Sequence, residues 1–218
     1  MYFSSRLQAG RSLAKMLYPK FRYENCAAIA LNNGGVSVGL EIARELHCVL
    51  NLLIIEEISL PREPLAIGAI NSEGTFSYND EYSAGAIEEL SSEYRGYIEE
   101  NKTSSISRIN KIVGSGGTIN KDLLKGRNII LVGDGFDSTL ALDMAYQFLK
   151  PIAIEKLIVA TPLASVKVVD WMHVYADEIY CLSVIEDYIN TDHYYDKKDV
   201  LKTDDAIKVI DNIVLHWK

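Results

Sequence analysis

The stretch IILVGDGFDSTLALDMA, residues 129–145, decides which fold this chain is expected to adopt. It opens on four apolar residues, a pattern typical of a strand buried on both faces of a parallel sheet. The polar turn GDGFDST follows at 133–139, and an apolar helical pattern runs over 140–149. A strand that leads through a short turn into a helix is the repeating unit of α/β proteins. Ligands of such sheets bind beyond the carboxyl ends of the strands, so the turn is the first candidate site.

The same alternation of strand and helix extends to both sides of this stretch. We expect helices over 6–18, 36–46, 165–175 and 203–213, buried strands over 26–31, 49–55, 128–132, 156–160 and 178–182, a small hairpin from 66–70 and 75–78, and a C-terminal tail over 183–218. We therefore predict a single α/β domain over residues 1–218, in which helices flank a central parallel sheet of about five strands.

Residues 71–120 are expected to form a helical and hairpin insertion between two strands of this sheet. Ile87, Leu90, Tyr94 and Tyr97 recur at helical spacing and share one face. The sequence GSGG at 114–117 has the composition of a flexible hinge. The pattern fits a packed amphipathic hairpin, and it also fits an inserted flap or an arm that joins two copies in a homodimer.

The composition limits the partners that we expect. The chain has 218 residues, a net charge of -8 and no run of Lys or Arg, which argues against nucleic acid and anionic membranes as partners. No apolar run approaches the ~20 residues of a membrane span, and no signal-peptide pattern is present. Cys26, Cys48 and Cys181 are odd in number and widely spaced, as expected for free thiols in a reducing compartment. We therefore expect a soluble, cytoplasmic protein.

The turn at 133–139 carries the residue types of an anion or sugar site. The first turn of the following helix offers free backbone N–H groups and the positive end of the helix dipole. Ser138 and Thr139 add hydroxyl groups, and Asp134 and Asp137 have carboxylates that accept from sugar hydroxyls or hold Mg²⁺. The alternative is structural, because Asp137 or Ser138 would also serve as the N-cap of the helix.

Five motifs occur in an order that resembles the type I phosphoribosyltransferase family, in particular its bacterial branch labelled "predicted phosphoribosyltransferase". The motifs are FSSRLQAGRSLAKML at 3–17, AIALNNGGVSVGLEIA at 28–43, PREPLAIGAI at 61–70, ILVGDGFDSTLA at 130–141 and HYYDKKDVLKTDD at 193–205. This resemblance covers nearly the whole chain. It implies the family's fold and, by analogy, its reaction, in which ribose-5-phosphate passes from phosphoribosyl pyrophosphate to a nitrogenous base with Mg²⁺.

The resemblance also implies roles for individual residues. Asp134 and Asp137 would be catalytic, with Asp134 also a weak Mg²⁺ ligand, and Asp137 matches an Asp that purine-salvage members carry. The remaining roles are a ribose and phosphate loop at Asp134, Gly135, Asp137, Ser138, Thr139 and Leu140, and a pyrophosphate loop at Asn32, Asn33, Gly34 and Gly35. The expected partner is phosphoribosyl pyrophosphate or a related phosphorylated ribose or nucleotide.

Several positions depart from the family pattern. Gly133 replaces the first residue of an acidic pair, and Thr139 replaces a glycine that lets the backbone close around phosphate. Asn33 stands where the branch has Arg, and Glu57 stands where relatives place Lys. At an effective dielectric constant near 20, a unit positive charge ~4 Å from a phosphate contributes roughly 4 kcal/mol of attraction before screening. The loss of such charges therefore weakens the expected binding of a polyphosphate. The alternative function is therefore a catalytically lapsed member that acts as a nucleotide-binding or protein-interaction and regulatory module.

Three other groups of residues are of interest. Tyr194 and Tyr195 in the tail would stack on a base or pack in the core, and packing is the simpler role. Arg62 would partly replace the missing Lys or be a solvated loop charge. We expect no catalytic role for the scattered histidines, which are His47, His173, His193 and His216.

Overall fold

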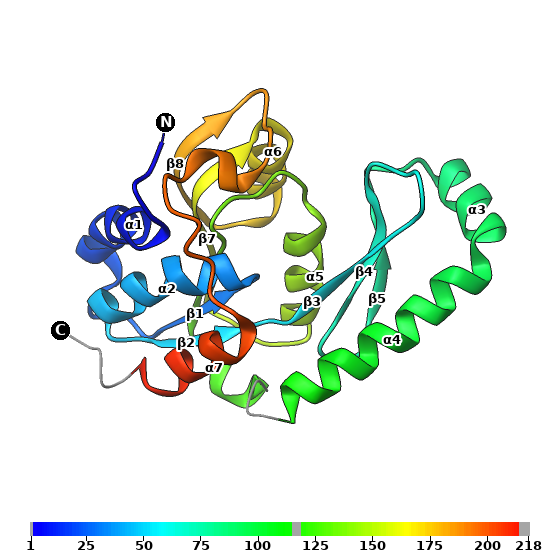
Figure 1. The fold of residues 1–218 in the computed structure, drawn as a ribbon. Helices are drawn as coiled ribbons and strands as arrows, with labels where there is room; N and C mark the ends of the chain where they lie inside the picture. The colour runs from blue at the N-terminus through cyan, green and yellow to red at the C-terminus, as the bar shows by residue number, and fades with distance from the viewer. Residues whose placement is uncertain (1, 115–118, 214–218) are drawn as a thin grey trace.

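The computed structural model describes residues 2–114 and 119–213. Its centre is a five-stranded parallel sheet with the strand order β2-β1-β6-β7-β8 (Figure 1). The strands are β1 Cys26–Ala30, β2 Val49–Leu52, β6 Asn128–Val132, β7 Lys156–Ser165 and β8 Glu178–Ile185. All residues of β1 and β6 are buried, as their apolar sequences predict. The predicted α/β fold with a central parallel sheet is confirmed.

Helices cover both faces of this sheet. The first face packs against α1 Arg6–Phe21, α2 Asn33–Leu46 and α7 Thr203–Asp211, and the second against α5 Leu140–Leu149 and α6 Val166–Tyr175. Alternate residues of β6 divide between the two layers, because Ile130 faces α1 and α2 while Ile129 faces α5 and α6. Both layers are therefore anchored on one central strand, which leads straight into the candidate turn.

A second, antiparallel sheet lies beside the first in Figure 1, with the strand order β3-β4-β5. It consists of β3 Ile55–Ser59, β4 Ala66–Asn71 and β5 Phe76–Tyr78, and the helices α3 Ala84–Glu93 and α4 Arg95–Val113 follow it. The sequence predicted β4 and β5 but not β3. The predicted strand at 49–55 in fact ends at Leu52, and Ile55 already belongs to the second sheet. A continuous apolar run does not show where the chain leaves one sheet for another.

Only part of the helix face that the sequence predicts in the insertion is packed against other residues. Leu90 and Tyr94 pack on a small core with Ile98, whereas Tyr97 is 41% exposed. The chain changes helix at Tyr94, which ends α3 and precedes α4, so the helical spacing does not continue through it. The hinge predicted at 114–117 falls mostly outside the described residues.

The tail beyond β8 returns across the start of the chain. The 3₁₀ turn η2 covers Thr191–Tyr194, and Phe3 then forms a parallel bridge with Tyr195. The backbone N–H of Phe3 donates to Tyr194 O at 2.9 Å, and that of Asp196 donates to Phe3 O at 2.9 Å. This crossing brings the tail close to the carboxyl end of β6. Within the part of the chain described, none of the helices has the length and apolar character needed to cross a bilayer.

Candidate functional site

The turn after β6 is extended because it pairs with the long end of β7. The N–H of Phe136 donates to Leu163 O at 3.0 Å, and the N–H of Ser165 donates to Phe136 O at 2.9 Å. The strand expected at 156–160 continues to Ser165, which provides these partners. Phe136 lies between Asp134 and Asp137 in the sequence and is buried. The two aspartates on either side of it differ in exposure. Asp134 lies inside the protein and Asp137 is exposed.

Asp134 is held by Arg6, the first residue of α1. Arg6 Nε donates to Asp134 Oδ2 at 2.6 Å, and the two residues are 1% and 4% exposed. The same guanidinium donates to Asp192 at 2.5 Å and contacts Asp199 at 3.4 Å, and it lies 4.5 Å from the ring centre of Tyr195. Tyr195 also donates its hydroxyl to the backbone oxygen of Asp134 at 2.6 Å. The tail therefore covers the carboxylate that the sequence assigned to ribose.

The ionisation of this buried pair follows from its surroundings. Burial raises the pKa of Asp134, while the charge of Arg6 and a hydrogen bond with Asn32 act in the opposite direction. Burial alone would lower the pKa of Arg6, but the carboxylates of Asp134 and Asp192 outweigh it and raise that pKa. For Asp134 burial is the larger effect and its pKa is raised, so the charged guanidinium occupies this carboxyl group by a hydrogen bond.

The glycine loop at the start of α2 approaches Asp134 from the other side. A Cβ on Gly34 would lie 2.0 Å from Asp134 Oδ2, so only glycine fits at this position. Asn32 Oδ1 accepts from the N–H of Gly35 at 2.6 Å, and Asn33 Nδ2 donates to Thr203 Oγ1 at 3.1 Å. Two polar groups of the predicted pyrophosphate loop are therefore bonded within the chain, although Asn32 is exposed and Asn33 is half-buried.

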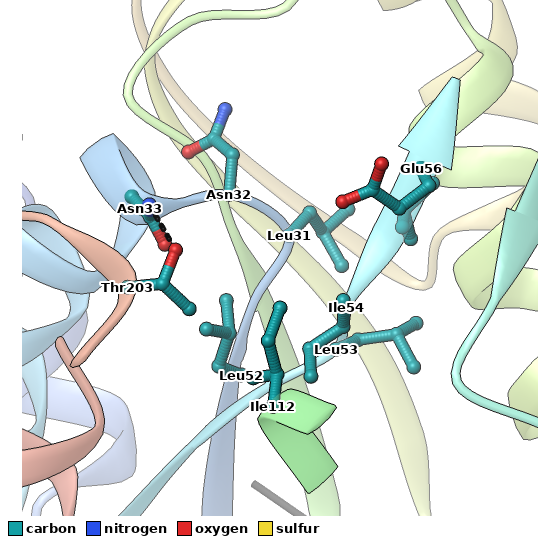
Figure 2. Close-up of a pocket in the computed structure, with 10 residues that line it drawn as sticks. Leu31, Asn32, Asn33, Leu52, Leu53, Ile54, Glu56, Ile112 and Thr203 are labelled. Atoms are coloured by element: carbon teal, nitrogen blue, oxygen red, sulfur yellow. Dashed lines mark hydrogen bonds between the residues drawn. The ribbon is translucent and has the colours of Figure 1, made fainter. Parts of the chain in front are cut away.

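A pocket of about 200 Å³ opens beside this loop (Figure 2). Figure 2 shows an apolar floor and a few polar groups at its edge. The floor comprises Leu31, Leu52, Leu53, Ile54 and Ile112. The charged group at the rim is Glu56, which Arg108 Nη2 approaches to 2.9 Å. The lining therefore lacks the unpaired cation that a diphosphate would require.

The hydroxyl groups of the phosphate loop also have partners. The N-cap of α5 is Thr139, so neither Asp137 nor Ser138 is the N-cap that the structural alternative predicts, although Ser138 Oγ accepts from the N–H of Leu140 at 3.3 Å. Thr139 Oγ1 donates to Asp80 Oδ1 at 3.1 Å, so it faces the turn that follows β5. A Cβ on Gly135 would lie 2.2 Å from the hydroxyl of Tyr188. The loop is thus packed between the second sheet and the tail.

A larger pocket, about 430 Å³, opens beyond the carboxyl ends of β7 and β8. It is lined by Leu65, Asp137, Ser138, Ser165, Val166, Lys167, Glu186 and Tyr188. Lys167 pairs with Glu81. Glu57 stands nearby on β3, and its pKa is raised by surrounding protein and by the negative charge of Asp137. The mouth of the site is therefore acidic. This agrees with the loss of positive charge that Asn33 and Glu57, in place of Arg and Lys, indicate in the sequence.

These residues do not fit a protein-bound Mg²⁺. Gly133 has no carboxylate, and the carboxylate of Asp134 is buried against Arg6. Among the described residues, no three His, Cys, Asp or Glu side chains are arranged to hold a metal ion. Within residues 2–114 and 119–213, no ligand set for the expected Mg²⁺ can therefore be assigned.

The site includes residues that the sequence pattern did not indicate. Arg6 was only part of a helix motif, and its partners Asp192 and Asp199 lie more than 180 positions away along the chain. Tyr194 and Tyr195 are 6% and 5% exposed and pack in the core, as the simpler alternative predicts. The available signal for Arg6 was its helical spacing from Ala9, Gly10 and Leu13, which places a charged residue on the buried face of α1.

Comparison with known proteins gives the family context. No protein-family model matches the chain. Two curated proteins of Mycobacterium tuberculosis, strains CDC 1551 and H37Rv, are each named "Putative phosphoribosyl transferase" and are 28% identical over 182 residues, or 83% of this chain. The match spans 40% of the length of those relatives.

Two solved structures share the fold. The protein TT1426 of Thermus thermophilus has a TM-score of 0.69 and 23% identity, covering 96% of this chain and 98% of that one. The AQ2163 protein of Aquifex aeolicus has a TM-score of 0.52 and 11% identity, covering 85% and 77%. In its fold and in its sequence relatives, this chain is similar to type I phosphoribosyltransferase-like proteins.

Proposed function

We propose that this chain is a phosphoribosyltransferase-like binding protein that takes a purine nucleoside and does not catalyse phosphoribosyl transfer. The observation that supports this most is the ion pair between Asp134 and Arg6, at 2.6 Å inside the protein. The carboxylate that the family resemblance assigns to the ribose is occupied by Arg6 and covered by the tail. It offers no free acceptor to a ribose hydroxyl in this conformation.

The charges around the pyrophosphate loop support the same proposal. Transfer develops positive charge on the ribose and negative charge on the departing diphosphate, so positive groups must face the leaving group. Asn33 is neutral and bonded to Thr203, and the neighbouring strand carries Glu56 and Glu57. A single carboxylate ~4 Å from a phosphate opposes binding by roughly 1 kcal/mol in water and by more where water is excluded.

The ligand class follows from the pocket of about 430 Å³, whose size suits a nucleoside. Asp137 is exposed at this pocket and offers a carboxylate to ring N–H groups of a purine. Ser138 and Ser165 offer hydroxyls, and Tyr188 offers an aromatic side chain. With Asp137 and Glu186 facing it, the pocket favours ligands with few negative charges.

A binding experiment tests this proposal. The protein is titrated calorimetrically with inosine and inosine monophosphate, and separately with phosphoribosyl pyrophosphate in the presence of Mg²⁺. We expect heat from inosine and none from phosphoribosyl pyrophosphate. The variant Asp137→Ala should lose inosine binding. Glu155→Gln should keep it, because Glu155 directly precedes β7 at the amino ends of the strands, away from the pocket. Tight binding of phosphoribosyl pyrophosphate by the unaltered protein would contradict the proposal.

Phosphoribosyl transfer itself is the second candidate. It is supported by the curated relatives named for that activity and by the exposed carboxylate of Asp137, which lines the larger pocket. Base-dependent release of diphosphate would distinguish it from binding alone.

A further inference from the structure

The turn at 79–83, which connects β5 with α3, is built on the second sheet. Asn79 is 2% exposed, its Nδ2 donates to Ala66 O at 3.0 Å, and its Oδ1 accepts from the N–H of Glu81 at 3.1 Å. Tyr82 donates its hydroxyl to Leu65 O at 2.9 Å. Both backbone oxygens lie at or just before the start of β4, so the turn is fixed to that strand. Its central residues, Asp80 and Glu81, are presented in a defined position.

This turn contacts the first residues of two helices of the main sheet. Asp80 Oδ1 accepts from the hydroxyl of Thr139, the N-cap residue of α5, at 3.1 Å. Glu81 pairs with Lys167 in the first turn of α6. Thr139 is 7% exposed and makes no side-chain capping bond within α5. The hydroxyl that would otherwise serve a phosphate is thus used by a carboxylate from the second sheet.

The local charges make the start of α5 unfavourable for an additional anion. Burial, together with the charges of Asp80 and Glu81, raises the pKa of Asp143 in the first turn of α5. Glu81 Oε1 is buried and has no hydrogen-bond partner among the described residues. A phosphate arriving here would meet the carboxylates of Asp80 and Asp143, the Glu81 carboxylate that is paired with Lys167, and a Thr139 hydroxyl that already donates to Asp80.

We infer that Asp80 is a specificity-determining residue of the site, whose carboxylate occupies the place of a ligand phosphate at the start of α5. This inference rests on the proposed binding site and deepens it, because it names the residue that selects nucleosides over their phosphates. A phosphorylated ligand must displace Asp80 from Thr139 in order to bind, whereas a nucleoside leaves this contact in place.

The test uses inorganic phosphate as the probe. Its dissociation constant is measured by calorimetry for the unaltered protein, for Asp80→Asn, which removes the charge but keeps the shape, and for Asp80→Glu, which keeps the charge. Glu155→Gln removes a unit charge at the far edge of the sheet and serves as the matched control. We expect Asp80→Asn to bind phosphate at least about tenfold more tightly than the other three proteins. Thermal melting verifies that every variant is folded.

Each other outcome would overturn the inference. Equal phosphate affinity in all four proteins, no phosphate binding by any of them, or an equal gain in Glu155→Gln each contradicts a role for Asp80. Inosine is titrated into the same samples to test the proposed function separately. If Asp80→Asn gains phosphate binding but no protein binds inosine, the inference stands and the proposed nucleoside function fails.

Discussion

Arg6 is the residue on which the site is organised. Its guanidinium contacts three carboxylates from two parts of the chain and is 1% exposed. A buried charge is tolerated only when it is paired and hydrogen-bonded, so each partner depends on the others. The same contacts that stabilise the fold occupy Asp134, which links stability to the absence of a free ribose acceptor.

We predict that Arg6→Ala strongly destabilises the protein, because it leaves the carboxylate of Asp134 buried without a partner. The loss in free energy of unfolding should be about 3–5 kcal/mol. The control is Arg11→Ala, which removes a 58% exposed side chain from Glu41 while Arg44 still pairs with that carboxylate. Its effect should stay below about 1 kcal/mol. Equal losses for both variants in urea denaturation would contradict the prediction.

The charge at Glu57 predicts a pH dependence. Its pKa is raised in the folded protein by surrounding protein and by Asp137, so the folded state holds this proton to a higher pH than the unfolded state. Its ionisation therefore reduces stability as pH rises above the ordinary value of 4.5, and the effect is complete above the raised pKa.

The variant Glu57→Gln should accordingly raise the melting temperature near pH 7. The gain should disappear at about pH 3.5, where the carboxyl is protonated in both states. Thermal unfolding followed by circular dichroism at the two pH values measures this. A gain of the same size at both would show that the charge of Glu57 is not its cause.

At the scale of elements, the site is the meeting of two loops and a tail. The loop that opens α2 fits against the turn after β6 because Gly34 has no side chain, and the tail closes the other side through Tyr188 and Tyr195. These contacts leave little unoccupied space beside Asp134. Rearrangement of any one of the three segments would have to precede ribose binding there.

Gly34→Ala should therefore disturb the protein more than an ordinary glycine substitution in a helix. Its Cβ would lie 2.0 Å from Asp134 Oδ2, which forces the loop or the Arg6 pair to move. The matched control is Gly85→Ala in the first turn of α3, where nothing lies within 4 Å. That change should be neutral or stabilising by up to about 1 kcal/mol. Similar melting temperatures for the two variants would show that the loop is free to adjust.

The sequence predicted the elements better than their contacts. The central strands were predictable because β1 and β6 are short apolar runs between helical patterns. The boundary between β2 and β3 was not, because the apolar run continues through both. The partners of Arg6 and Thr139 depend on how distant segments pack, and neither Asp192 nor Asp80 has a local pattern that indicates its partner.

For the whole molecule, the fold is similar to that of phosphoribosyltransferases, whereas the contacts at the site indicate that the ribose and phosphate groups would not be bound. The central sheet is shared with the TT1426 structure, and the curated relatives to which the chain is similar are named putative phosphoribosyl transferases. The turn after β5 meanwhile brings Asp80 onto Thr139, and α1 brings Arg6 onto Asp134, which are the residues that would hold phosphate and ribose. The net charge of -8 includes acidic groups at this same edge of the sheet.

The measurement that tests the account most directly is diphosphate release. The unaltered protein is incubated with millimolar phosphoribosyl pyrophosphate, Mg²⁺ and each common purine and pyrimidine base, and released diphosphate is followed over time. The account predicts no release above the rate without protein. Repeated, base-dependent turnover that Asp134→Ala abolishes would contradict it, because it would show that Asp134 is accessible to substrate despite its ion pair with Arg6.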